Sequence, residues 1–385
     1  MKLLLPTLLL ALSALQPRPQ SERPEADFLR RCEADGRRLW GRSLCAPVVV
    51  VDPGSGDVRT TRPAPGPLPP LRANTAFDWA GERWIMVLAP LPGDPAALAE
   101  LLFHEAWHGQ QAALGFPANN VTAAHLDESL ARYWLRLEWA ALAEALASRG
   151  ERQRRHIAQA LAFRARRLHG RADAATAERA LMRHEGLAAY TGAALSGDPT
   201  GRARAALAGG VRPGLGRSFA YASGPAWGLL LDRFRPGWRR SGSSLDLPEM
   251  MPVPAVALAR PDAYGGTRLL SEEMQGGAER AARIAAAVAA TAEGRGLRLP
   301  IGRMQLDYDP NRVSTAPDGS TIYHRITLRD QWGRISVEGV GLRILPDFSA
   351  AFSAWPLSEG ALELAPGWRI ESRQGGGATL VPPRR

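Results

Sequence analysis

Apolar residues recur at helical spacing through the middle of the chain, and toward the end they gather into short runs typical of strands. From Asp94 to Ser196 the pattern is helical almost throughout. Breaks are expected near the glycines of this region, at Gly115, Gly150, Gly170 and Gly197. Further helices are expected over 217–234, interrupted at Ser223-Gly224-Pro225, and over 269–293. The centre of the protein should therefore be mainly helical.

Short β-branched and aromatic runs precede this helical region. Val48–Val51 and Trp84–Leu88 have the composition of strands, and the proline-rich stretch 62–70 between them indicates a surface loop. The run 84–88 leads into the helical region, and an edge strand in that place can hydrogen-bond an extended peptide.

After Gly296 the pattern changes to short strands separated by turns, such as 325–328 and 334–337 with a turn at 330–333. We therefore expect an α+β fold, mostly helical with a small strand region upstream and a small β-rich domain at the C-terminus. The expected divisions are an export signal over 1–15, an N-terminal segment with the proline-rich loop over 16–75, a mostly helical domain over 76–296 and a β-rich domain over 297–385.

Length and composition indicate an exported globular protein. With 385 residues, 45% of them hydrophobic, the chain can bury a sizeable core. It begins Met1-Lys2 and continues with a short apolar run to Leu15, as in a signal peptide, with cleavage expected near residues 11–14. The run is shorter than the roughly 20 residues of a membrane span. We expect a periplasmic or extracellular protein with no stable membrane span after cleavage; a retained N-terminal anchor is the alternative.

Cysteine content bears on the compartment of the protein, and the charge distribution argues against a nucleic-acid-binding protein. Cys32 and Cys45 are the only cysteines, and in an oxidising compartment they can form one local disulfide. The net charge of +10 comes from arginines scattered along the chain, apart from Lys2. Nucleic-acid binding needs a concentrated basic stripe with interleaved aromatic residues, so no nucleic-acid partner is expected.

The segment His104-Glu105-Ala106-Trp107-His108 carries the chemistry. Residues four apart share one face of a helix, so both histidines can bind one Zn²⁺ while Glu105 acts as general base. Asp94 followed by Pro95 is a helix start, which places the segment in a helix. The pattern predicts the active-site core of a zinc hydrolase.

Such a zinc needs a third protein ligand and an open position for water. A histidine at the short spacing is excluded, because Gln111 and Leu114 occupy those positions. Two glutamates compete: 19 residues separate His108 from Glu128, and 76 separate it from Glu185. Glu185 lies in a small, apolar helical stripe where a carboxylate is costly without a metal or a cation. Glu128 has charged neighbours that a solvated helix face explains, so Glu185 is favoured and Glu128 stays open.

The spacing of one glutamate and the sequence context of the other resemble the gluzincin class of zinc peptidases. The spacing of Glu128 resembles thermolysin and the zinc aminopeptidases, whereas the context Glu185-Gly186-Leu187-Ala188-Ala189-Tyr190 looks like the glutamate-bearing helix of those aminopeptidases. The chain is also similar, over most of its length, to a group of exported bacterial proteins in which the Glu-Gly-Leu-Ala helix recurs. The matching segments are 104–111, 132–139, 185–192 and 223–232. The resemblance implies a zincin-like catalytic domain with Glu185 as ligand and brings no known substrate.

The expected reaction is peptide-bond hydrolysis by metal-activated water, with Glu105 moving the proton to the leaving amine and a peptide or protein as substrate. The tetrahedral oxyanion needs a hydrogen-bond donor. Tyr221 is the first candidate and Tyr190 the second; a packed tyrosine with a satisfied hydroxyl is the alternative for each.

Two other functions are compatible with the sequence. One is a degenerate zinc-binding or scaffold protein that binds cell-envelope components through the β-rich domain. The intact Glu105 speaks against it, since a binding module needs no base there. The other is a non-enzymatic envelope protein whose motif is accidental. Metal content separates this last case from the others, and the oligomeric state is left open.

Overall fold

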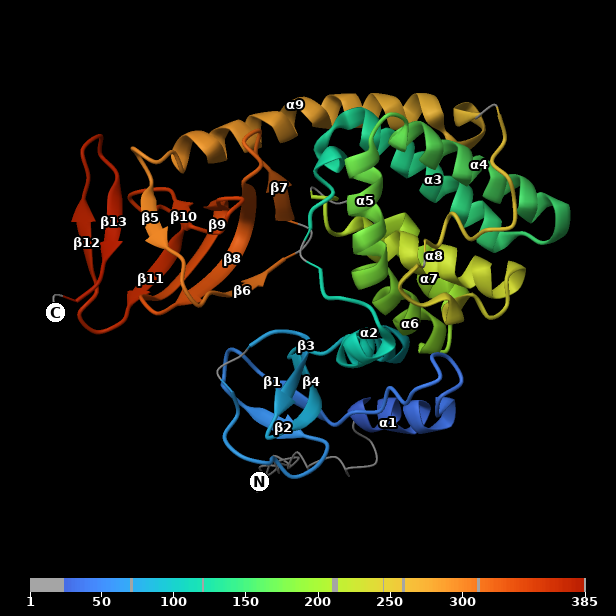
Figure 1. The fold of residues 1–385 in the computed structure, drawn as a ribbon, viewed down its shortest axis with the longest axis horizontal. Coiled ribbons are helices and arrows are strands. Elements are labelled where there is room, and N and C mark those ends of the chain that lie inside the picture. Colours follow the sequence, from blue (N-terminus) through green and yellow to red (C-terminus); the bar gives the residue numbers. More distant parts are fainter. Residues whose placement is uncertain are drawn as a thin grey trace, which may run out of the picture.

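Helices and strands occupy separate parts of the molecule (Figure 1), so the expected α+β class is confirmed. The computed structural model describes residues 24–69, 72–119, 121–209, 214–244, 246–257, 260–309 and 312–383. The expected export signal over 1–15 lies outside the described residues.

In the main core of the helical part, α6 packs against both α2 and α8, and α3 packs beside α8. The α-helices are α1 Pro24–Asp35, α2 Pro95–Gln110, α3 Ser129–Ala147, α4 Gly150–Leu168, α5 Ala172–Leu181, α6 Leu187–Leu195, α7 Pro199–Gly209, α8 Phe219–Phe234 and α9 Gly266–Ala290. Short 3₁₀ turns are η2 Ala112–Leu114, η3 Ala124–Asp127, η5 Trp238–Ser244 and η6 Pro261–Tyr264, and a π turn, η4 Met182–Gly186, joins α5 to α6. The long α9 runs along the helical part and on over the C-terminal sheet (Figure 1).

The start and end of α2 follow the local sequence. The Asp94 side chain accepts hydrogen bonds from two backbone N–H groups of the first turn, at 3.1 and 3.2 Å, and Pro95 follows it. The α-helix ends at Gln110, and residues 112–114 form a 3₁₀ turn. The chain then leaves the helix at Gly115, whose left-handed φ of 84° suits glycine.

The break expected at Ser223-Gly224-Pro225 is absent, because α8 continues through Pro225. The serine and glycine serve packing instead. Ser223 Oγ accepts a hydrogen bond from the buried Trp139 indole at 2.8 Å. A Cβ on Gly224 would lie 2.2 Å from the carbonyl oxygen of Gly186, so glycine allows α8 to approach η4 closely. Burial of almost the whole helix outweighs the local cost of proline.

The N-terminal sheet has strand order β2-β1-β4-β3. Its strands are β1 Val48–Val51, β2 Val58–Thr60, β3 Thr75–Trp79 and β4 Glu82–Leu88, so strands from both sides of residue 75 share one sheet. β1 and β4 pair in parallel, and β1 and residues 84–87 of β4 are buried, whereas residues 62–67 of the loop are exposed. The strand expected over 84–88 is therefore internal, and the free edge beside α2 belongs to β3.

The C-terminal sheet begins at Leu297 and runs in the order β12-β13-β5-β10-β9-β8-β6, with β11 paired to β9 and β7 to β8. Its strands are β5 Leu297–Pro300, β6 Gln305–Tyr308, β7 Val313–Thr315, β8 Thr321–Asp330, β9 Gly333–Ile344, β10 Ala350–Ser353, β11 Gly360–Leu364, β12 Arg369–Ser372 and β13 Ala378–Val381. The expected turn at 330–333 joins β8 to β9.

Contacts from α9 and from η3 join this sheet to the helical part. Ala287 of α9 packs with Ala316 and Ile322 in a small apolar cluster. The backbone N–H of Thr315 in β7 donates a 2.9 Å hydrogen bond to the carboxylate of Asp127 in η3. These contacts place β6, which pairs with β8, near the helices.

Cys32 of α1 and Cys45 form a disulfide, which ties α1 to the segment before β1. Within the described ranges, no helix combines the length and apolarity that a membrane crossing requires.

Buried charges join α3, α4 and α5. The Glu178 carboxylate accepts hydrogen bonds from Arg164 at 2.6 Å, from Arg167 at 2.8 and 3.0 Å and from His125 at 2.9 Å. Arg167 also donates to Glu138 at 2.6 Å. Burial alone would raise the pKa of Glu178, but these partners outweigh it and lower that pKa strongly. The carboxylate is thus ionised and essential to balance two buried guanidinium groups.

We expect Glu178→Gln to lower the free energy of unfolding by about 3–5 kcal/mol, because it removes the buried carboxylate that Arg164 and Arg167 share. Urea denaturation followed by circular dichroism measures this. Glu128 is the matched control, since it also binds an arginine, Arg171, at 2.7 and 2.8 Å but on the exposed surface. Glu128→Gln should cost less than about 1 kcal/mol. Equal losses in the two variants would contradict the assigned importance of burial.

Candidate metal centre

The imidazole rings of two histidines of α2 converge. His104 and His108 lie one turn apart, and their Nε2 atoms are 3.2 Å from each other. His104 is buried, and His108 is partly buried beside it. Two ring nitrogens at this separation on adjacent turns are arranged as metal ligands.

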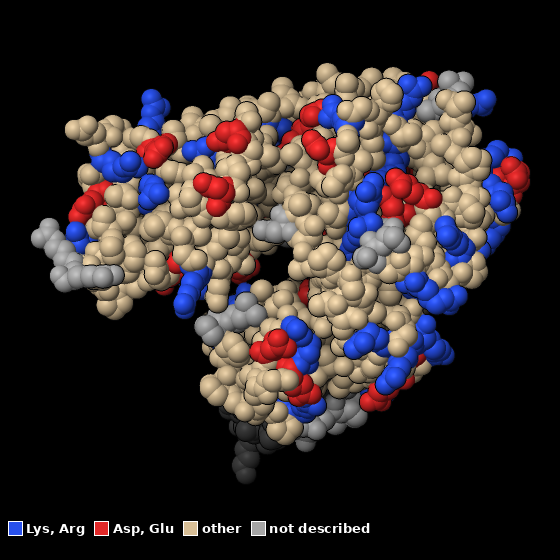
Figure 2. Space-filling model, viewed as in Figure 1, with Lys and Arg blue, Asp and Glu red and all other residues tan. Residues whose placement is uncertain are grey.

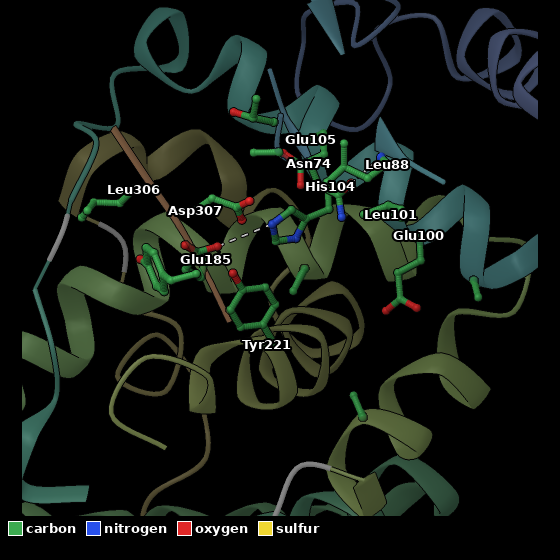
Figure 3. Close-up of a pocket in the computed structure, with 16 residues that line it drawn as sticks. Asn74, Leu88, Glu100, Leu101, His104, Glu105, Glu185, Tyr221, Leu306 and Asp307 are labelled. Carbon is green, nitrogen blue, oxygen red and sulfur yellow. Dashed lines mark hydrogen bonds and ion pairs between the residues drawn. The ribbon is translucent and has the colours of Figure 1, made fainter. Parts of the chain in front are cut away.

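Glu185 completes the cluster from a different part of the chain. It lies in η4, where the π turn interrupts the run from α5 to α6. Its Oε2 is 3.5 Å from His104 Nε2 and 3.5 Å from His108 Nε2. The first of these contacts is the dashed line in Figure 3. Single π turns in α-helices are frequent at functional sites, because they change which face of the helix a side chain occupies.

The three atoms fit a zinc ion. A tetrahedral zinc with bonds of about 2.0–2.2 Å places its ligand atoms about 3.3–3.6 Å apart, close to the separations of 3.2 and 3.5 Å found here. Glu185 Oε2 is also buried and accepts no hydrogen bond from the described residues. An unsatisfied buried carboxylate oxygen is costly, and a cation between it and the histidines would satisfy it.

Gln111 orients the cluster from behind. Its side-chain oxygen lies 2.8 Å from His108 Nδ1 and 3.0 Å from His184 Nδ1, while its amide donates to the carbonyl oxygen of Pro117 at 2.8 Å. Because the amide group is engaged, the oxygen accepts from the ring N–H at Nδ1 of His108. This hydrogen bond leaves Nε2 of His108 unprotonated and free to bind a metal.

Arg217 and His184 lie beside the second carboxylate oxygen of Glu185. Arg217 Nη2 lies 3.9 Å and His184 Nε2 lies 3.6 Å from Glu185 Oε1. Burial lowers the pKa of His184 to about 4, so this ring is neutral at physiological pH. Arg217 is therefore the permanent positive charge beside the glutamate, and it also lies over the Tyr308 ring at 5.6 Å.

Glu105 and Tyr221 stand next to the cluster. Glu105 is buried, and burial raises the pKa of its carboxyl against the opposing effect of the two histidines. The Tyr221 ring stacks on His104, with centroids 5.3 Å apart. Burial raises the pKa of Tyr221 well above its usual value, so the hydroxyl keeps its proton. Figure 3 shows this hydroxyl directed toward Glu185 and His104.

A cleft of about 680 Å³ opens beside these residues. Its walls come from the segment around β3, from α2, from α6 to α8, and from β6 of the C-terminal sheet. The lining residues are Ala73, Asn74, Thr75, Leu88, Ala97, Glu100, Leu101, His104, Glu105, Glu185, Ala189, Ala206, Tyr221, Leu306, Asp307 and Tyr308. Figure 2 shows the surface hollowed where the two sheets and the helical part meet. The volume lies in the range of ordinary ligand sites.

Two of the residues considered from the sequence lie elsewhere. Glu128 precedes α3 and binds Arg171 with both carboxylate oxygens, so of the two candidate glutamates the structure brings Glu185 to the histidines. Tyr190 is fully buried, and its hydroxyl donates a 2.8 Å hydrogen bond to Asp232. Tyr190 is thus a packed tyrosine with a satisfied hydroxyl.

Four residues of the site were not predicted from the sequence to belong to it. The role of Gln111 could have been predicted, because it follows His108 by three residues and so lies on the same helix face. From the sequence alone, its residue type served only to exclude a histidine ligand at the short spacing. Arg217, Asp307 and Tyr308 give no local signal, because only the packing of distant segments brings them to the cleft.

Comparisons with protein-family models, with curated proteins and with solved structures found no match to this chain. The chemistry of the site is therefore argued from its own geometry.

We expect the purified protein to contain about one zinc per chain, measured by elemental analysis, because three ligands converge on one point. His108→Ala and Glu185→Ala should each lose the metal, since two ligands hold zinc weakly. Glu128→Ala should keep it and serves as the control. A parent protein that stays zinc-free after the metal is supplied, or a Glu128 variant that alone loses it, would refute the site.

Proposed function

We propose that this protein is a zinc-dependent metallopeptidase that hydrolyses peptide bonds. The carrying observation is the convergence of His104 Nε2, His108 Nε2 and Glu185 Oε2 at separations of 3.2 and 3.5 Å on the wall of a cleft that also holds Glu105. Three protein ligands with one side open to a cleft are typical of catalytic zinc sites, whereas structural sites have four. A zinc ion held there supplies a Lewis acid that lowers the pKa of water and polarises a carbonyl group.

Glu105 is the proton carrier of the proposed reaction. It follows the ligand His104 directly on α2 and lines the cleft, and within the described part of the chain it forms no ion pair. Its carboxylate takes a proton from the water that attacks the carbonyl carbon. It then delivers that proton to the nitrogen of the leaving amine, so that the C–N bond breaks without releasing an amide anion.

Tyr221 is the proposed donor to the oxyanion. As the carbonyl oxygen gains negative charge, the hydroxyl donates a hydrogen bond to it. The stacking on His104 and the burial of the ring hold this donor in place before the substrate binds. A preorganised donor stabilises the charge without reorganisation during the reaction.

The surroundings of the cleft favour a peptide as substrate. Ala73, Asn74 and Thr75 line it where the chain enters β3, which is the free edge of the N-terminal sheet. An extended peptide can add to such an edge through backbone hydrogen bonds. The Cys32–Cys45 disulfide supports action in an oxidising compartment, the periplasm or the exterior.

Glu105→Gln should reduce hydrolysis of an internally quenched peptide library by at least about 100-fold, because glutamine cannot accept the proton. The zinc content of the variant should equal that of the parent, since no ligand is changed. Zinc in a parent that cleaves no peptide would instead favour the scaffold function, and an active Glu105→Gln variant would exclude Glu105 as the base.

Tyr221→Phe should lower kcat about 10- to 100-fold and leave KM within about threefold, because the hydrogen bond acts mainly in the transition state. The Tyr190→Phe variant is a control of the same chemistry placed outside the cleft. It should lose stability in thermal unfolding and keep the kcat of its folded fraction. Unchanged kcat in Tyr221→Phe would remove this tyrosine from the mechanism.

A further inference from the structure

The C-terminal sheet contributes a carboxylate to the cleft. β6 lies at one end of the strand order of that sheet, and its residues Leu306, Asp307 and Tyr308 line the cleft together with His104 and Glu185. Figure 3 shows the Asp307 carboxylate directed into the cleft, toward His104 and Glu185. The strand is therefore a wall of the site as well as part of a separate sheet.

The cleft is lined by four carboxylates and, among the described residues, by no lysine or arginine. Three of the four have an assigned partner or task. Glu100 binds Arg202, whose Nε lies 2.6 Å from the carboxylate. Glu185 faces the histidines and Arg217, and Glu105 is the proposed base. Asp307 is the fourth carboxylate, and among the described residues it has neither an arginine partner nor an assigned task.

Asp307 forms no ion pair or side-chain hydrogen bond with the residues that the structure describes. Arg325 and Arg329 of the neighbouring β8 attract it only at a distance, and burial, the larger effect, raises the pKa of its carboxyl. A half-buried carboxylate without a counter-ion binds a cation favourably, because the attraction is less screened than on an open surface. The position of Asp307 in a substrate-sized cleft makes a substrate group the natural cation.

We propose that Asp307 is a specificity-determining residue that binds a cationic nitrogen of the substrate, and so selects peptides with a positive charge near the cleaved bond. This inference rests on the proposed function, because it assigns a substrate class to that same cleft. The shared chemistry is an ammonium or guanidinium group. It comes either from a free N-terminus or from a lysine or arginine side chain.

The test measures binding, so that it does not depend on turnover. The zinc-supplied full chain carrying Glu105→Gln is titrated calorimetrically with three kinds of alanine tetrapeptide amide. One is N-acetylated and neutral, one has a free N-terminus, and one is N-acetylated with lysine at each position in turn. Each titration is repeated with Asp307→Asn and with Glu363→Gln added. Glu363 is the control because its exposed carboxylate lies on β11 of the same sheet, 3.5 Å from Arg334 and outside the cleft lining.

A cationic peptide should bind about tenfold more tightly than the neutral one, as expected of one partly buried ion pair. Asp307→Asn should reduce this preference to less than about twofold, and Glu363→Gln should preserve it. The peptide that shows the preference identifies its source as the N-terminus or a side chain. Retention of the preference in Asp307→Asn, or its absence in the parent, would overturn the proposal.

Zinc content and peptide hydrolysis, measured on the same preparations, separate this proposal from the proposed function. If zinc and hydrolysis are present but charge has no effect on binding, only the assignment of Asp307 fails. If the Asp307-dependent preference is present in a protein without hydrolysis, the peptidase function fails and the cleft is a cation-binding site.

Discussion

The close approach of three helical segments is the constraint on which the site depends. A Cβ on Gly192 of α6 would lie 2.4 Å from the carbonyl oxygen of Glu100 in α2, and one on Gly224 of α8 would lie 2.2 Å from that of Gly186. Only glycine permits both contacts. They bring η4 and Glu185 within 3.5 Å of the two histidines of α2. Small residues at helix crossings thus set the ligand geometry as directly as the ligands themselves.

The surrounding charges are arranged in two ways. Away from the cleft, Glu178 and Glu138 neutralise Arg164 and Arg167 in the core between the helices, which holds α3, α4 and α5 together. At the cleft, the carboxylates of Glu105 and Asp307 are without ion pairs in the described part of the chain. Paired buried charges are structural, whereas carboxylates left unpaired at a cavity wall are poised to bind protons or cations. The same residue type therefore serves both architecture and chemistry in this protein.

The C-terminal sheet is joined to the site through few contacts, yet these decide its shape. Tyr308 lies beneath the guanidinium of Arg217, which in turn faces Glu185. One chain of contacts therefore runs from β6 to the candidate metal ligand. A sheet that first looks like an appended domain thus forms a wall of the cleft, opposite the residues that α2 contributes.

Local relations determined what the sequence could predict. The cap at Asp94, the spacing of His104 and His108 and the turn at 330–333 involve residues a few positions apart, and helix and hairpin geometry fix such neighbours. The helix break expected at Pro225 was wrong for the complementary reason. Packing of Gly224 against Gly186 outweighed a local preference that the sequence shows plainly.

Only the tertiary structure separated Glu185 from Glu128. It also placed Arg217 and Asp307 at the site and showed which strand forms the sheet edge. Both glutamates lie near helices at spacings that a metal site allows, so no local rule separates them. Burial does: η4 faces the core beside α2, whereas Glu128 lies at the surface where Arg171 satisfies it. The sequence by itself determined the placement of His104 and His108 on one helix face with Glu105 beside them, and the fold class, because these depend on short-range periodicity. The approach of Glu185 to the histidines and the shape of the cleft were decided only by packing, because the free energy of burial depends on segments far apart in the chain.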